Sequence, residues 1–218
     1  MKVIITGATG MVGEGVMLEC AENPAVSGIL LVSRKPYGAL PSKVRELIVP
    51  DFMQVESAAD QLSGYDACFF CAGVSSVGKS EAEYTRITYD TTLHFAQTLV
   101  KVNPGMVFVY VSGAGTDSTE KGRMMWARVK GRTENALTRV GFRAEYNFRP
   151  GFMKAMPGQK NLPGSYLAFA WLYPVLRVVA ANYASTVKGV GRAMIRCAAE
   201  GYPKQILEVR DINALGKA

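Results

Sequence analysis

The sequence is poor in the residue that most often builds metal and hydrolytic sites. His94 is the single histidine among 218 residues, and it lies within a helical pattern. We therefore expect a packed or surface side chain at this position rather than a ligand. One histidine so placed excludes a histidine-rich metal site and leaves little room for a Ser-His-Asp triad, so no metal is predicted.

Cysteine is scarce too, with Cys20, Cys68, Cys71 and Cys197. Cys68 and Cys71 form a C-x-x-C inside a strand pattern, where side chains three residues apart point to opposite faces. They cannot easily share a metal or a disulfide, so buried free thiols are expected, as in a reducing cytoplasm. The start of the chain has only three apolar residues after Lys2, which is not a signal peptide pattern. These features together predict a cytoplasmic protein.

No block of like charges occurs, although the net charge is +7. Such a charge suits an anionic ligand, and it is also compatible with nucleic acid or an acidic membrane surface. The basic residues are scattered and no nucleic-acid-reading module is present, so we do not expect nucleic acid as a partner. The length of 218 residues and the 49% hydrophobic content indicate one soluble globular domain with a sizeable core.

Long uninterrupted apolar runs are absent as well. The most apolar stretch, 165–181, is interrupted by Pro174 and Arg177 and is at the short limit for spanning a bilayer. We interpret it as a buried or substrate-covering helix. A peripheral membrane contact or a protein contact through 165–181 is the alternative.

What the chain does have begins at its first residues. A β-branched run, Lys2–Ile5, leads into Gly7, Gly10 and Gly13, and a helical pattern follows. In a G-x-x-G-x-x-G turn, one glycine allows the sharp turn, one lets backbone N–H groups approach a pyrophosphate, and one lets the helix pack on the strand. The helix N-terminus then faces the phosphates. The pattern predicts dinucleotide binding, in which Thr9, Met11 and Val12 supply the surrounding backbone.

Strand and helix patterns alternate along the rest of the chain. Strands are expected at 2–5, 28–33, 46–52 with its exit loop, 66–71, 106–112, 144–148 and, as a seventh, 205–209; helices are expected after the glycine turn, at 57–62, at 81–102 and at 120–140. This predicts an α/β fold: a single Rossmann-type doubly wound parallel sheet of six to seven strands with helices on both faces. Residues 1–218 would form one domain, with 152–202 as a small C-terminal, substrate-covering helical part.

The loop after the second strand carries Arg34 and Lys35, and no acidic residue occurs between Pro24 and Arg45. An NAD site usually has an acid there for the ribose 2′-OH, whereas a basic residue accommodates a 2′-phosphate. The loop therefore favours NADP over NAD; a plain surface loop is the alternative. Asp51 and Phe52 could border the adenine, although Asp51 could equally be a turn residue.

Several features resemble the extended and atypical short-chain dehydrogenases, which include the NAD-dependent epimerases and dehydratases. They are the glycine turn, Cys71–Gly73 after the fourth strand, Ser112 ending the fifth, Lys130 in the next helix and Arg149–Gly151 after the sixth. The 126–131, 148–151 and 212–217 stretches look similar to the Tat-interacting-protein branch of the atypical group. The resemblance implies hydride transfer between NADP(H) and a carbonyl or alcohol of an unidentified small molecule. It also implies that Cys71, Ala72 and Gly73 line the ribose side, that Lys130 binds the nicotinamide ribose, and that Pro150, Gly151 and Phe152 cover the nicotinamide.

The chain departs from that family at the Tyr-x-x-x-Lys pair, because Trp126 stands where the tyrosine acid/base would be. An indole N–H donates a hydrogen bond but does not titrate usefully. Tyr84, Tyr89 or a water held by Lys130 could replace the acid. Ser112 is the nearest hydroxyl to orient a carbonyl, with Thr116 or Ser118 as substitutes. In an alternative alignment with the family pattern, Gly113 stands at the position of this hydroxyl.

The sequence therefore predicts cofactor binding without the usual catalytic tyrosine, and three interpretations of its function remain open. The chain is an NADP-dependent oxidoreductase with a different acid, a non-catalytic NADP(H)-binding redox sensor or regulator, or an interaction scaffold that uses 165–181. By the same resemblance, the helices at 81–102 and 121–140 could form a homodimer.

Overall fold

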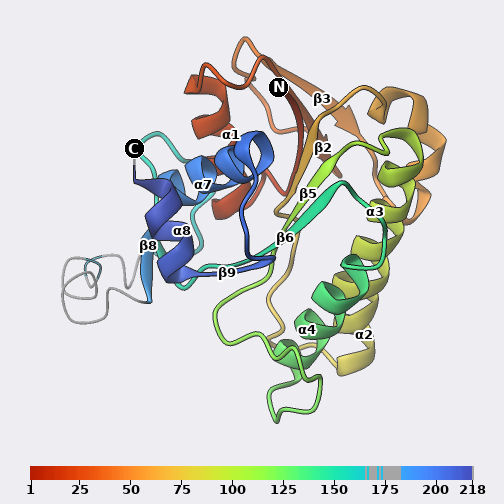
Figure 1. The fold of residues 1–218 in the computed structure, drawn as a ribbon, viewed down its shortest axis with the longest axis vertical. Coiled ribbons are helices and arrows are strands. Elements are labelled where there is room, and N and C mark those ends of the chain that lie inside the picture. Colours follow the sequence, from red (N-terminus) through yellow and green to blue (C-terminus); the bar gives the residue numbers. More distant parts are fainter. Residues whose placement is uncertain (165, 167–170, 172, 174–182, 218) are drawn as a thin grey trace.

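A parallel sheet forms the centre of the molecule. The computed structural model describes residues 1–164, 166, 171, 173 and 183–217. Within them a seven-stranded sheet has the order β3-β2-β1-β4-β5-β6-β9, and every neighbouring pair is parallel (Figure 1). Its strands are β1 (Lys2–Thr6), β2 (Gly28–Ser33), β3 (Val44–Ile48), β4 (Ala67–Phe70), β5 (Val107–Val111), β6 (Ala144–Arg149) and β9 (Ile206–Glu208). The direction of winding reverses between β1 and β4, and in such sheets ligands bind in the crevice outside the strand ends at this point.

Helices cover both faces of the sheet. One face carries α1 (Met11–Glu22), α7 (Val187–Glu200) and α8 (Val209–Gly216); the other carries η1 (Phe52–Leu62), α2 (Glu81–Thr85), η2 (Arg86–Asp90), α3 (Thr91–Val102) and α4 (Met125–Leu137) (Figure 1). The predicted doubly wound α/β fold is thereby confirmed. A separate two-stranded parallel sheet joins β7 (Phe152–Lys154) to β8 (Ala184–Thr186), and the sequence patterns had not indicated it.

The side chains of each central strand alternate between two cores. Val3 and Ile5 pack with α1 and α7, whereas Ile4 packs with α3 and η1. Cys68 lies in the second core and Cys71 borders the first, so the two thiols of the C-x-x-C do point to opposite faces. All four cysteines are free.

Some element boundaries differ from the predicted ones. The third strand runs over 44–48 rather than 46–52, because the Asp51 carboxylate accepts the Met53 N–H and begins η1 there, well before the predicted 57. The long helix at 81–102 is present, but its middle turn, η2, is a π-helix. The helix predicted from 120 begins only at Met125, because Asp117 holds the preceding residues in a loop by accepting the N–H groups of Thr119 and Gly122.

The C-terminal part of the chain contributes to the core as well as to the rim. α7 packs against α1, where Gly15 and Gly191 leave room for Val187 and Glu19. Its apolar residues lie in the same core as β1, so this portion of 152–202 belongs to a helical layer rather than to a substrate cover. Most of 165–181 lies outside the described residues, and so does the interpretation of that stretch. In the described part of the chain, no helix has the length and apolarity needed to cross a membrane.

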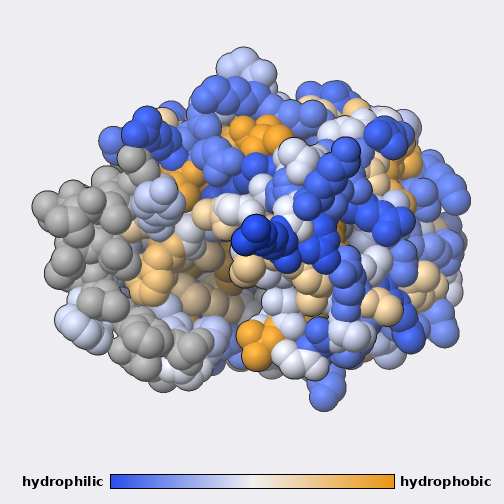
Figure 2. All heavy atoms as spheres, turned by 90° about the horizontal axis from the view of Figure 1, so that it is seen from below, coloured by the Kyte–Doolittle hydropathy of each residue, from blue (hydrophilic) through white to orange (hydrophobic). Residues whose placement is uncertain are grey.

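The face seen from below is mostly hydrophilic, and apolar residues appear on it in small separate patches (Figure 2). Exposed apolar side chains among the described residues include Val77 and Met124, which belong to the loops before α2 and α4. These loops lie at the carboxyl end of the sheet.

Candidate functional site

The glycine turn joins β1 to α1 with backbone approaches that only glycine permits. Gly7 has φ +73°, and a Cβ there would lie 2.6 Å from the carbonyl carbon and oxygen of Cys71. A Cβ on Gly13 would lie 2.3 Å from the Gly7 carbonyl oxygen. Gly7 therefore packs the turn against the exit of β4, and Gly13 packs the helix against the turn, as the spacing predicts.

Gly10 has a different environment. It precedes α1 in an extended conformation, it is exposed, and a Cβ there would meet only the Gly7 oxygen, at 3.5 Å. The first helical hydrogen bond runs from Glu14 N–H to Gly10, so the N–H groups of Met11, Val12 and Gly13 precede it and have no helical acceptor. Free N–H groups beside an open surface at a helix N-terminus fit an anionic group such as a pyrophosphate.

The exit of β4 is tied to the end of β1. The Thr6 hydroxyl oxygen accepts hydrogen bonds from the N–H groups of Cys71 and Ala72, each at 3.1 Å. Gly73 follows in the open, with no atom within 4 Å of a Cβ placed on it. Cys71, Ala72 and Gly73 thus lie at the reversal between β1 and β4, next to the glycine turn.

The basic loop after β2 stands at the same edge of the sheet. Arg34 and Lys35 are exposed, and no ion pair of the described residues involves either. Further along, Asp51 is exposed and caps η1. Phe52 is 6% exposed and packs on Phe95 at 5.1 Å between ring centroids, so its side chain belongs to the core and cannot border an adenine.

Lys130 reaches the end of β5 from α4. Its Nζ donates a hydrogen bond to the Ser112 carbonyl and lies 3.4 Å from that of Val111. Burial lowers the pKa of Lys130 to about 8, and Glu134 opposes the shift. Trp126 lies one turn earlier on the helix, against the 113–115 loop, where a Cβ on Gly115 would be 3.6 Å from the indole. The tryptophan and lysine thus keep the one-turn spacing of a Tyr-x-x-x-Lys pair.

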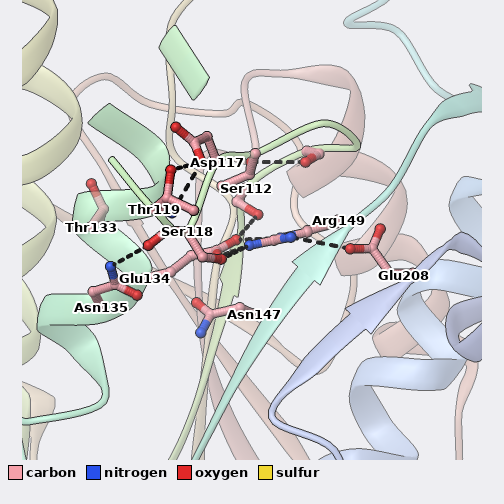
Figure 3. Close-up of polar contacts among 12 residues, drawn as sticks. Ser112, Asp117, Ser118, Thr119, Thr133, Glu134, Asn135, Asn147, Arg149 and Glu208 are labelled. Atoms are coloured by element: carbon pink, nitrogen blue, oxygen red, sulfur yellow. Dashed lines mark hydrogen bonds and ion pairs between the residues drawn. The ribbon is translucent and has the colours of Figure 1, made fainter. Parts of the chain in front are cut away.

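Ser112 does not point into the crevice. Its hydroxyl donates to the Glu134 carboxylate and lies 3.2 Å from the Phe148 carbonyl, and the residue is 7% exposed (Figure 3). The predicted substitutes are engaged as well, since Thr116 donates to the Gly113 carbonyl and the Ser118 hydroxyl accepts from Arg149. The structure therefore does not support the prediction that Ser112 orients a substrate, because a buried carboxylate takes its hydroxyl.

The two candidate replacement acids differ in exposure, because Tyr84 is buried and Tyr89 is partly exposed. Tyr84 is 2% exposed, and burial raises its pKa, with the neighbouring Thr88 opposing the shift. A proton donor with so little exposure and a raised pKa is poorly placed to serve a substrate, so the structure does not support Tyr84 as the acid. The Tyr89 ring lies under the Arg132 guanidinium, 4.3 Å from the ring centroid.

A buried charged network lies beside Ser112, and no local sequence pattern indicates it. Arg149 bonds to the Glu134 carboxylate through Nε and Nη2 and to Glu208 through Nη1 (Figure 3). Glu134 is 1% exposed, although a glutamate in an amphipathic helix normally indicates a solvated face. Glu134, Arg149 and Glu208 are far apart in the sequence, so only the folded chain reveals that α4, β6 and β9 meet at Arg149.

The segment after β6 connects the loop that follows β5 to β8. The Pro150 carbonyl accepts from Ala114 N–H, and Phe152 N–H donates to Tyr183. A Cβ on Gly151 would lie 2.3 Å from the Tyr183 oxygen, so this glycine permits a close backbone approach. Pro150, Gly151 and Phe152 therefore lie at the carboxyl end of β6, beside the loop that follows β5. The described residues hold no group of three side chains placed to bind a metal.

The chain is similar in sequence to a known family and to several known proteins. Residues 3–121 match the NAD dependent epimerase/dehydratase family. The mitochondrial protein fmp52 of Emericella nidulans is 28% identical over 159 residues, which is 70% of this chain and 66% of that protein. The mitochondrial FMP52 of Candida albicans is 25% identical over 213 residues, 92% of this chain and 89% of that protein.

Solved structures share the fold at low identity. DesIV, a dTDP-glucose 4,6-dehydratase from Streptomyces venezuelae solved with NAD and TYD bound, superposes with a TM-score of 0.68 at 16% identity, covering 99% of this chain and 80% of that one. WbmF of Bordetella bronchiseptica, solved with NAD+, gives 0.67 at 16% identity, covering 98% and 76%.

The relatives correct the expected location. Both fmp52 proteins are named as mitochondrial, so the prediction of a cytoplasmic protein is contradicted. Buried free thiols are a poor guide to location, because they show how the cysteines are packed and do not distinguish one reducing compartment from another.

Proposed function

Because the chain belongs to the NAD-dependent epimerase/dehydratase family, we propose that it binds NADP(H) and acts as an oxidoreductase on a carbonyl or alcohol of a small molecule. The observation that carries the choice of NADP(H) is the exposed pair Arg34 and Lys35 after β2, which no described acid neutralises. A 2′-phosphate needs cations at this place, and a 2′-hydroxyl needs an acid that the loop lacks.

Different residues would bind different parts of the cofactor. The N–H groups of 11–13 and the open face of Gly10 would hold the pyrophosphate. Asp51, exposed at the start of η1, would border the adenine. Cys71–Gly73 would line the ribose side and Lys130 would bind the nicotinamide ribose, with 150–152 over the nicotinamide.

The chemistry follows from what this chain retains and what it has lost. Bound NADPH would supply a hydride to a carbonyl carbon, and the carbonyl oxygen then needs a proton. Trp126 can polarise that oxygen through its indole N–H but cannot give up a proton. Lys130 stands one turn away with a pKa lowered to about 8 by burial, so its amine can hold a water or pass a proton near neutral pH.

A second candidate function is a non-catalytic NADP(H)-binding protein that reports redox state to a partner. Two observations favour it: the Ser112 hydroxyl is bound to Glu134, and Tyr84 is buried. In that case the cofactor site would be kept while the proton donor was lost.

Two further properties belong to the proposal. The fmp52 relatives support a mitochondrial location for this chain. The helices α2, η2, α3 and α4 pack together on one side of the sheet and would form the contact of a homodimer, as in the superfamily that the chain resembles.

The first test is a fluorescence titration of the purified protein with NADPH and with NADH. We expect NADPH to bind at least about tenfold more tightly, the ratio that ~1.4 kcal/mol provides. Equal affinities would remove the 2′-phosphate role of Arg34 and Lys35. No binding of either dinucleotide would remove the cofactor role itself. Loss of NADPH absorbance with a panel of small aldehydes and ketones then separates the oxidoreductase from the sensor.

A further inference from the structure

A carboxylate is buried at the first turn of α1. Glu14 is 0% exposed, and its oxygens accept hydrogen bonds from the Tyr37 hydroxyl at 2.8 Å, the Lys160 N–H at 3.0 Å, and the Asn161 N–H and side-chain amide at 2.8 and 3.1 Å. Burial alone would raise the pKa of Glu14, but these hydrogen bonds outweigh it and lower the pKa below its usual value. The group is therefore a carboxylate at neutral pH, next to the positive end of the helix dipole.

Three of these four donor groups come from a distant segment, residues 156–161, which we call the strap. The strap has a second attachment at the same turn, because Gln159 donates its side-chain N–H to the Met11 carbonyl at 2.6 Å. Gln159 also accepts the Met156 N–H, so its side chain closes the strap on itself. Gly15 leaves the space for this contact, since a Cβ there would lie 3.0 Å from the Gln159 side-chain oxygen. The strap thus lies on the turn that carries the free N–H groups.

The fourth donor group, the Tyr37 hydroxyl, comes from the basic loop. Tyr37 follows Arg34 and Lys35 by two to three residues, and its backbone N–H is fixed by the Glu46 carboxylate at 2.9 Å. Its hydroxyl bond to Glu14 then holds this loop beside α1. One buried carboxylate therefore connects the phosphate turn, the basic loop and the strap, and the first two are the segments to which we assign the dinucleotide.

We propose that Glu14 is a positioning residue that clasps the strap and the basic loop around the bound dinucleotide and so slows its release. This inference rests on the proposed cofactor binding. Both the basic loop and the strap are tied to this one carboxylate, so removal of its charge loosens two segments at once. Loosened segments hold the bound dinucleotide less firmly and raise its dissociation rate, whereas association depends mainly on diffusional encounter and changes little.

The test compares Glu14→Gln with Glu22→Gln, an exposed glutamate at the other end of the same helix. Hydrogen exchange reads the Lys160 and Asn161 amides without cofactor, and stopped-flow fluorescence reads NADPH association and dissociation. In Glu14→Gln we expect both amides to exchange and NADPH to dissociate roughly tenfold faster, as loss of hydrogen bonds to a charged group implies, with little change in association. Glu22→Gln should behave as the wild type.

Gln159→Met keeps the test decisive if Glu14→Gln does not fold, because it removes the other attachment of the strap without touching a buried charge. It too should speed NADPH dissociation. Unchanged dissociation with intact NADPH binding would overturn the clasp alone. Faster association with unchanged dissociation would overturn it as well, since the strap would then obstruct the site. A wild-type protein that binds neither dinucleotide would overturn the proposed function, and the clasp with it.

Discussion

Arg149 and Glu134 form a doubly hydrogen-bonded ion pair between β6 and α4, with side chains that are only 10% and 2% exposed. The Glu134 carboxylate also takes the Ser112 hydroxyl, and the hydrogen bonds and charge of Glu134 and Glu208 raise the pKa of Arg149 against the effect of burial. The pair thus anchors the end of β5 and withholds Ser112 from the crevice.

Arg149→Met should strongly destabilise the protein. It leaves the Glu134 charge buried without its cation, which costs about 3–5 kcal/mol. Urea unfolding at neutral pH measures the loss. Arg128→Met is the matched control, because its pair with Glu81 is 24% and 54% exposed and should cost about 0–1 kcal/mol. Equal losses of unfolding free energy in the two variants would show that the buried pair contributes no more to stability than the exposed pair.

Substitution of two glycines of the turn, Gly13 and Gly10, should affect folding stability and NADPH binding differently. Gly13→Ala forces a Cβ to within 2.3 Å of a backbone oxygen, so we expect a loss of about 1–3 kcal/mol in unfolding free energy. Gly10→Ala meets only one atom, at 3.5 Å, and should change stability by no more than about 0.5 kcal/mol.

Gly10→Ala should instead weaken NADPH binding. Its methyl group stands at the open surface where the pyrophosphate would approach, so NADPH affinity should fall roughly tenfold or more while the fold is kept. Thermal unfolding and titration of the same sample measure both quantities. Full NADPH affinity in Gly10→Ala would place the phosphates elsewhere.

Arg34→Ala combined with Lys35→Ala should weaken NADPH far more than NADH. Loss of two charge-assisted contacts predicts a roughly 10- to 100-fold weaker NADPH complex, with NADH changed by no more than about twofold. The control is Lys101→Ala with Arg139→Ala, which removes the same charge from exposed positions on α3 and at the end of α4. An equal loss for both dinucleotides would rule out a 2′-phosphate contact.

Lys130 should give the stability a pH dependence of a defined sign. Burial lowers its pKa from 10.5 to about 8, so between these values the unfolded chain keeps a proton that the folded protein has released. The unfolding free energy contributed by Lys130 therefore rises with pH across this window and is constant below it.

The measurement is urea unfolding of wild type and Lys130→Met from pH 7 to pH 10. Wild-type stability relative to the variant should increase above pH 8, where other groups cancel in the difference. Lys101→Met, at an exposed lysine, should give a flat difference. A flat line for Lys130→Met would mean that its amine titrates as a solvated lysine does.

Trp126→Tyr should restore the missing proton donor beside Lys130. A positioned general acid contributes about 10²–10⁴-fold, so NADPH consumption with small aldehydes should rise at least tenfold. Trp126→Phe, which offers neither a donor nor an acid, is the control and should show no gain. If Trp126→Tyr gains nothing while NADPH still binds, the non-catalytic reading is the better one.

The sequence by itself determined the sheet, the glycine turn and the basic loop. These are local: the period of two in β1 places Ile4 and Val3 in different cores, and Gly7 is required by its own φ of +73°. The same periodicity separated Cys68 from Cys71. These features depend only on neighbouring residues and not on distant partners, so the sequence is sufficient to predict them.

The tertiary structure alone decided what the buried charges do. Glu14 meets Lys160 and Asn161 across 146 and 147 residues, and Glu134 meets Arg149 across 15. In the sequence each glutamate reads as a solvated helix residue, because burial is set by segments that pack against it from elsewhere. Ser112 likewise donates its hydroxyl to a partner on α4 that the local sequence does not indicate. The position of a strand end follows from the chain's own pattern, whereas the partner of a buried carboxylate follows only from the assembled fold.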